Sequence, residues 1–203
     1  MTDITHTAIT HKVSLPVGSI GARASGWWGL WFLLLSEASI FAYLFFSYFY
    51  FSIQPPADWI PGASPDFSYS APQSVIILVG CVTAWFAHRS IAGDRVALAL
   101  VGLGLTLLLC SGFIALQFID WYSKPFGLSS STYSSEYFVI TGFHLAHIVV
   151  GWFMFAMLFI WTALGYFDSV RHLPITIGKV YWYFLAVIWL AIFFVLYGTP
   201  FFF

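Results

Sequence analysis

Five long apolar segments dominate this sequence and leave few folds open to it. The hydrocarbon core of a bilayer is about 30 Å thick, a distance that an α-helix of about 20 apolar residues crosses. Five segments approach or exceed that length, at about residues 27–51, 73–89, 96–119, 137–165 and 179–197. Lipid offers backbone groups no hydrogen-bond partners, so each segment must satisfy its own. The sequence therefore predicts an all-α membrane bundle of five transmembrane helices.

The composition places the chain in the membrane class and gives no support for a nucleic acid partner. Only 7% of the 203 residues are charged and 61% are hydrophobic, whereas soluble domains carry roughly 25% charged residues. The formal net charge of -1 gives no reason to expect nucleic acid binding. We expect one membrane domain over residues 1–203, in which residues 1–26 form a polar N-terminal tail.

The basic residues predict how the chain is oriented. In a path of five helices, six of the seven fall on the side of the N-terminus, namely Lys12, Arg23, Arg89, Arg95, Arg171 and Lys179. Lys124 falls on the other side, where Asp120 and Glu136 flank a polar loop and are expected to meet water. Because cytoplasmic loops are enriched in Lys and Arg, we expect the N-terminus inside and the C-terminus outside. The loop of about residues 52–72, which holds five prolines, is then irregular structure on the outer side.

Three ionisable side chains lie deep within the apolar segments. Glu37 lies in the first segment, roughly 15 Å from its inner end, and His144 and His147 lie in the fourth at a similar depth. Ionisable groups at that depth are costly and usually functional. We expect Glu37 to form a hydrogen bond with His144 or His147 in the interior of the bundle.

A metal or haem site is the alternative reading of the two histidines. A spacing of three places both rings on one side of a helix, and Glu37 is the only obvious third ligand. A closed site needs more ligands than these. We therefore favour polar contacts between helices over metal binding. Catalytic triads, glycine-rich phosphate loops and CxxC pairs do not occur, so we expect no catalytic residue.

Two further patterns concern helix ends and helix faces. The inner turn around His88 and Arg89 places basic groups at headgroup level, which is typical of ordinary topology signals but also suits phospholipid contact or proton collection. The third segment carries small residues near one face, which predicts close helix packing there. These residues are Ala97, Gly104, Ser111 and Ala115.

Four motifs carry a resemblance to a known family. They are Glu37 with Phe41 in SEASIF, the turn from Trp85 to Arg95, the segment from Gln117 to Phe126, and TGFH followed by His147. They occur in the order and at the spacing found in subunit III of cytochrome c and quinol oxidases, in its five-helix form. The last segment departs from that family, since Tyr183 and Ala186 stand where a histidine and an aspartate are typical.

The resemblance implies a role within a larger complex. Subunit III binds no haem or copper itself, so haem and copper are expected in partner subunits. It packs on subunit I, alongside subunit II and others, binds phospholipid and supports proton uptake by the respiratory oxidase. By resemblance, Glu37, His144, His147, His88 and Arg89 form the lipid-binding or intramembrane polar network. A multi-pass protein of the bacterial inner membrane is expected.

Two other functions remain open from the sequence. An accessory subunit of a nitric oxide reductase is possible because that group has similar five-helix proteins. An independent transporter would usually show interrupted helices and converging polar groups at mid-membrane. Only Glu37 and the histidine pair fit that description, which disfavours a transporter.

Overall fold

The computed structural model describes residues 25–56 and 67–198, and every regular element in them is helical. The long helices are α1 (Ser25–Ile53), α2 (Phe67–Ala92), α3 (Val96–Ser123), α4 (Thr132–Ala163) and α5 (Leu173–Phe193), and α5 continues into a π-helical turn, η1 (Phe194–Gly198). Five helices are long and apolar enough to cross a membrane. The predicted all-α fold with five spans is therefore confirmed.

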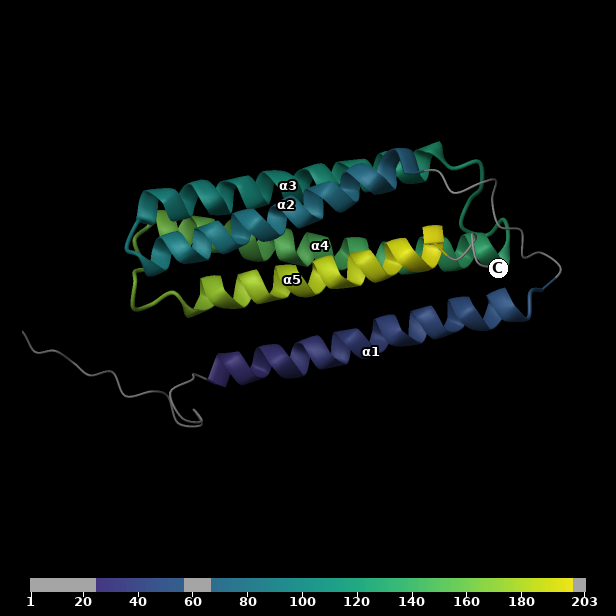
Figure 1. Cartoon of the computed structure of the whole chain (residues 1–203), viewed down its shortest axis with the longest axis horizontal. Coiled ribbons are helices and arrows are strands. Elements are labelled where there is room, and N and C mark those ends of the chain that lie inside the picture. The colour runs from purple at the N-terminus through teal and green to yellow at the C-terminus, as the bar shows by residue number, and fades with distance from the viewer. Residues whose placement is uncertain (1–24, 57–66, 199–203) are drawn as a thin grey trace, which may run out of the picture.

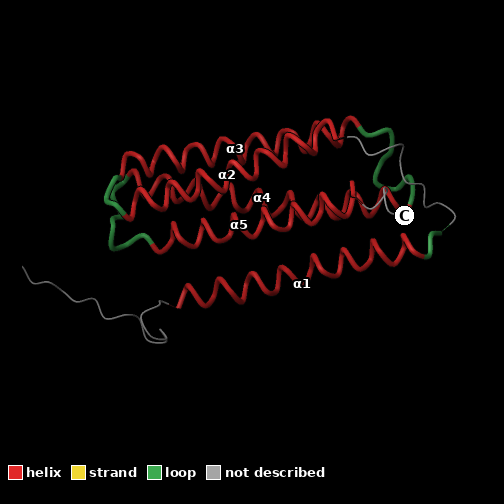
Figure 2. Tube along the Cα trace, viewed as in Figure 1, coloured by secondary structure: helices red, strands yellow, loops and turns green. Residues whose placement is uncertain are grey.

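The helices run side by side, and α1 lies at one edge. Helices α2 to α5 form a compact group, while α1 runs along α4 and α5, apart from α2 and α3 (Figure 1). The tube view shows short loops joining α2 to α3 and α4 to α5 at one end of the bundle (Figure 2). Most of the outward-facing side chains are apolar, as a bilayer requires.

Close backbone approach joins α2 to its neighbours on two sides. A Cβ at Gly102 of α3 would meet Ala87 of α2 at 2.8 Å, and a Cβ at Gly80 of α2 would meet the Trp182 ring of α5 at 2.6 Å. The Trp182 indole also donates a hydrogen bond to the Ile77 carbonyl, 3.2 Å away. Small residues are therefore required where these helices touch.

The small-residue face expected on α3 meets α4 at its edge, where the Trp152 indole donates to the Ser111 hydroxyl at 3.0 Å and Phe159 lies beside Gly104, and it is not the face that packs against α2. Ala97, Ser111 and Ala115 are exposed, and Gly104 is only half-buried. The packed face instead contains Gly102 together with other buried residues, namely Ala99, Leu103, Thr106, Cys110 and Phe113. Both faces repeat at helical spacing in an apolar helix, so the spacing alone did not identify the face that meets α2.

The first connection is shorter than expected. Helix α2 begins at Phe67, so Pro72 lies inside it, where irregular structure was expected. Proline in a helix removes one backbone hydrogen bond. Packing compensates, because Ser70 and Gln73 are fully buried on either side of Pro72. Residues 57–66 of the expected loop, and residues 1–24 of the expected tail, lie outside the described ranges.

The other helix ends follow local capping chemistry. Helix α4 begins at Thr132, five residues earlier than expected, because Ser131 and Ser134 form a reciprocal capping box. Helix α5 begins at Leu173, six residues earlier than expected, with Pro174 in its first turn. Proline is well tolerated there because the first-turn N–H groups have no partners within the helix.

Candidate functional site

A hydrogen bond between Glu37 and His147 joins α1 to α4 inside the bundle. The Nε2 atom of His147 lies 2.8 Å from Oε2 of Glu37. Both side chains are largely buried, with 15% of His147 and 24% of Glu37 exposed. The ring of Phe41, one turn after Glu37, packs 5.2 Å from the imidazole. Of the two histidines expected to meet Glu37, the structure therefore selects His147.

The contacts of His147 show which of its two ring nitrogens carries a hydrogen toward its own helix. Nδ1 of His147 lies 2.6 Å from the Phe143 carbonyl, which can only accept, so Nδ1 carries a hydrogen. Nε2 then either donates to a Glu37 carboxylate or accepts from a protonated Glu37. The pair is an imidazolium with a carboxylate in the first case and two neutral groups in the second. Its net charge is zero in both, which suits the interior of a membrane.

His144 points to a different partner and is fully buried. Its Nε2 atom lies 3.2 Å from the Leu185 carbonyl of α5 and donates to it. The ring packs between Trp189, at 5.3 Å, and Phe113, at 5.5 Å. Nδ1 is buried without a hydrogen-bond partner among the residues described, so this imidazole is neutral, with its lone pair on Nδ1.

The two histidines therefore do not converge on one ligand. His147 faces α1 and His144 faces α5, although three residues separate them. In the described ranges, no three His, Cys, Asp or Glu side chains are grouped so that they could hold a metal ion. The arrangement is that of two polar contacts between helices, the reading favoured from the sequence.

Among the described residues, the two positions where α5 departs from the family pattern, Tyr183 and Ala186, form no hydrogen bond with Glu37 or His147. Ala186 is buried, and Tyr183 packs at the edge of the core. A different tyrosine reaches α4, because the Tyr181 hydroxyl donates to the His147 carbonyl at 3.1 Å. A phenol therefore supplies the α5 contact to the same turn of α4.

His88 and Arg89 lie at the end of α2 next to the α2–α3 turn, away from the other predicted residues. Nζ of Lys179 donates to Nδ1 of His88 at 3.5 Å, and the His172 ring lies 5.5 Å from the His88 ring. Arg89 points elsewhere, with its guanidinium 5.8 Å from the centre of the Trp85 ring. His88 therefore faces α5, while Arg89 lies beside an aromatic side chain of its own helix.

The turn between α4 and α5 carries its own paired charges. Oδ1 of Asp168 accepts hydrogen bonds from the backbone N–H groups of Arg171, at 2.7 Å, and Val170, at 2.9 Å. The Arg171 guanidinium also donates to Oδ2 at 2.9 Å. These bonds, led by the backbone bond from Arg171, hold the pKa of Asp168 below its ordinary value. Arg171 is therefore a basic residue with a partner.

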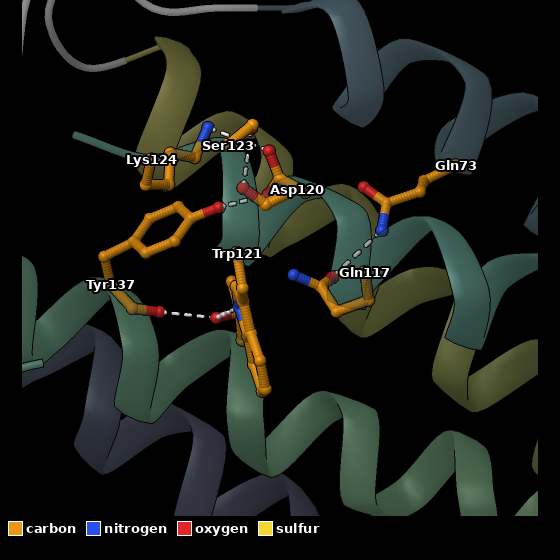
Figure 3. A network of polar contacts seen from close by, with 8 residues as sticks. Gln73, Gln117, Asp120, Trp121, Ser123, Lys124 and Tyr137 are labelled. Carbon is orange, nitrogen blue, oxygen red and sulfur yellow. Dashed lines mark hydrogen bonds and ion pairs between the residues drawn. The ribbon is translucent and has the colours of Figure 1, made fainter. Parts of the chain in front are cut away.

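A buried polar cluster at the end of the bundle where α3 ends and α4 begins was missed from the sequence (Figure 3). Asp120 was expected to meet water, yet it is 1% exposed, with Lys124 at 2.9 Å and the Tyr137 hydroxyl donating to it. Beside it, the Gln73 side chain lies 3.0 Å from that of Gln117 and links α2 to α3. The i, i+4 spacing of Asp120 and Lys124 was the available signal.

A second polar contact joins α1 to α4 nearer the C-terminal end of α1. The Ser47 hydroxyl donates to Oε1 of Glu136 at 2.7 Å. Glu136 had been left without a role because water was expected at its position. Ten residues, or roughly 15 Å of helix, separate Ser47 from Glu37. The C-terminal half of α1 is therefore attached to α4 as well as its middle.

The chain is similar to one protein family along most of its length. The family model described as cytochrome c oxidase subunit III matches residues 19–199. The protein named cytochrome c oxidase subunit 3 of Patiria pectinifera is 31% identical over 187 residues, covering 89% of this chain and 70% of the relative. The proteins of the same name from Cyprinus carpio and Locusta migratoria are 30% and 31% identical. They cover 82% and 84% of this chain.

The match covers less of those relatives than of this chain. The carp and locust proteins are covered over 66% and 67% of their lengths. The chain thus spans about two thirds of the length of the curated relatives it matches.

Proposed function

The chain belongs to the cytochrome c oxidase subunit III family, and we propose that it serves as the third, cofactor-free subunit of a proton-translocating haem–copper terminal oxidase. The match of the family model to residues 19–199 is the observation that carries this proposal. The membrane fold agrees with it, since five helices are long and apolar enough to span a bilayer.

The chain has a supporting role in this proposal, and electron transfer takes place elsewhere. The Nε2 atoms of His144 and His147 already have protein partners, Leu185 and Glu37, so these two nitrogens serve contacts between helices. Haem and copper are held by partner subunits. The chain packs on subunit I of the oxidase as a single membrane domain, in a complex that also contains subunit II.

Phospholipid binding and proton uptake are the two supporting activities. The Glu37–His147 bond holds α1 against α4 while α1 stays apart from α2 and α3 (Figure 1). Phospholipid chains cover the flank of α1 that this arrangement leaves free. With the N-terminus in the cytoplasm of a bacterial cell, the inner-end group of His88 and Lys179 faces the side from which protons are taken up.

Removal of this chain from the purified oxidase tests the supporting role. Without it, we expect the haem spectrum to be unchanged, proton uptake to slow, and activity to decay earlier during turnover. Loss of the haem signal with the chain would contradict the cofactor-free assignment. Identical proton uptake and identical durability without the chain would contradict the supporting role.

A further inference from the structure

A pocket of about 610 Å³ lies beside the turn between α2 and α3. The residues that line it include Trp85, Phe86, Arg89, Ser90, Arg95 and Leu98. Its volume is within the range of sites that bind small ligands, roughly 300–1,000 Å³. It lies where two membrane-spanning helices end, the depth at which lipid headgroups meet protein.

Two guanidinium groups at this pocket form no ion pair with any of the described residues. Over residues 25–56 and 67–198, ion pairs join Lys124 to Asp120, His147 to Glu37 and Arg171 to Asp168. Neither Arg89 nor Arg95 forms one in those ranges. This distinguishes them from Arg171, the other arginine described at the same end of the bundle.

The charges at the pocket favour a ligand with a single negative charge. Asp94 is the acidic residue of this turn, and it forms no ion pair within the described residues. Two guanidiniums and one carboxylate leave a net charge of about +1, which one phosphodiester would neutralise. A zwitterionic headgroup would also bring an ammonium group close to the two guanidiniums, so we expect it to bind more weakly.

The remaining walls of the pocket are apolar. Trp85, Phe86 and Leu98 are 47%, 37% and 41% exposed, a high exposure for large apolar side chains. The Trp85 ring also lies beside the Arg89 guanidinium, 5.8 Å from its centre, and this contact holds the cation next to the apolar wall. A ligand that fits must therefore combine an anionic head with hydrocarbon chains.

We propose that this pocket binds the headgroup of an anionic glycerophospholipid. The phosphate lies between Arg89 and Arg95, and the acyl chains run along Trp85, Phe86 and Leu98. The inference deepens the lipid-binding part of the proposed function and rests on it. It concerns the α2–α3 turn, away from Glu37 and α1, and it names Arg95 as the second basic residue of the site.

Lipid retention by the purified complex tests the proposal. The complex is equilibrated with equal amounts of phosphatidylglycerol and phosphatidylcholine, and retained lipid is measured by mass spectrometry. We expect preference for phosphatidylglycerol in the natural complex. The double variant Arg89→Gln/Arg95→Gln should lower that preference about tenfold, since each basic residue near a membrane surface strengthens binding to anionic lipid. The control Arg171→Gln removes a partnered arginine from the same end and should change it less than twofold.

Two results would overturn the proposal. One is equal retention by the double variant and the Arg171→Gln control. The other is displacement of bound phosphatidylglycerol by inorganic phosphate at constant ionic strength, which would identify a site for a free anion. The natural complex gives a second measurement that needs no variant, because its preference should disappear in 1 M salt. A preference that persists there would count against the two arginines.

These outcomes are separate from the fate of the proposed function. Haem content and oxygen consumption of the natural complex report whether the chain belongs to an oxidase, and they do not depend on this pocket. A complex that consumes oxygen but shows no preference for anionic lipid would refute the pocket alone.

Discussion

Glu37 and His147 are the polar side chains that attach the middle of α1 to the rest of the bundle. The bond between them is 2.8 Å long and spans two helices that are far apart in the sequence. Hydrogen bonds between membrane helices contribute about 0.6 kcal/mol on average and about 1.7 kcal/mol at most. The bond therefore fixes which faces of α1 and α4 meet more than it adds to total stability.

A double-mutant cycle on Glu37 and His147 measures this contact. We expect the variants Glu37→Ala and His147→Ala, alone and combined, to show a coupling of about 0.6–1.7 kcal/mol in reversible unfolding, because each change removes the same bond. The control pair is Ser39→Ala with His147→Ala, since Ser39 bonds only to the Leu35 carbonyl of its own helix. A coupling no larger than that of the control pair would refute the contact.

The buried pair of Asp120 and Lys124 predicts that one substitution lowers the stability of the protein and that adding a second restores most of it. Their side chains are 1% and 10% exposed. Lys124→Met leaves the Asp120 carboxylate without its cation and should cost about 3–5 kcal/mol, as breaking a buried pair does. Adding Asp120→Asn removes the uncompensated charge and should restore most of that loss. Thermal unfolding checks the order, and a double variant less stable than Lys124→Met would contradict it.

The sequence predicted the presence of these polar groups better than their partners. Glu37 was expected to meet a histidine because both lie at a similar depth, but depth does not distinguish His144 from His147. Asp120 was expected to meet water because it follows an apolar segment. Helix α3 in fact continues to Ser123, and Tyr137 of α4 covers the carboxylate. The choice of His147 over His144 depends on the direction of each side chain. The burial of Asp120 depends on how far α3 extends beyond its apolar segment.

Packing of α2 against α3 depends on one glycine. At Gly102 an added Cβ would meet backbone atoms of Ala87 at 2.9 Å, and backbone cannot move aside as a flexible side chain can. Gly102→Ala should therefore destabilise the protein by about 1–3 kcal/mol, the usual cost of overpacking. The comparison to make is thermal unfolding of this variant in the same detergent as the natural chain.

Gly104→Ala is the matched control for that change. It lies on the same helix, and its added Cβ would have an ordinary contact of 3.5 Å with Phe159. Alanine also favours helix over glycine by about 1 kcal/mol. Gly104→Ala should therefore be neutral or stabilising. Equal destabilisation by the two variants would show that α2 and α3 are not in close contact at Gly102.

Helix positions followed from the sequence, whereas helix faces and ends did not. Hydrophobic length is enough to place a span, because the bilayer sets it. The face of a helix that packs against a given neighbour depends on that neighbour as well. Helix α3 has two faces with small residues, one with Gly104 and one with Gly102. The ends depend on features that hydropathy does not contain, such as the capping box at Ser131 and the burial of Gln73 beside Pro72.

The orientation of the whole bundle is predicted from the charges of its loops. Single cysteines at Gly93, in the α2–α3 turn, and at Ser129, in the α3–α4 loop, report opposite sides. In intact cells, a membrane-impermeant maleimide should label Ser129→Cys and leave Gly93→Cys unlabelled until the cells are opened, because basic loops stay inside. The natural chain serves as the control for Cys81 and Cys110. The reverse labelling pattern would place the N-terminus outside.

The proposed role of the whole molecule requires that it work beside subunits that carry the redox centres. The most direct measurement is the visible spectrum and oxygen consumption of whatever purifies through an affinity tag on this chain. We expect haem absorbance, bound copper and oxygen reduction coupled to proton translocation. A colourless chain that purifies alone, or a complex that reduces nitric oxide without moving protons, would contradict it.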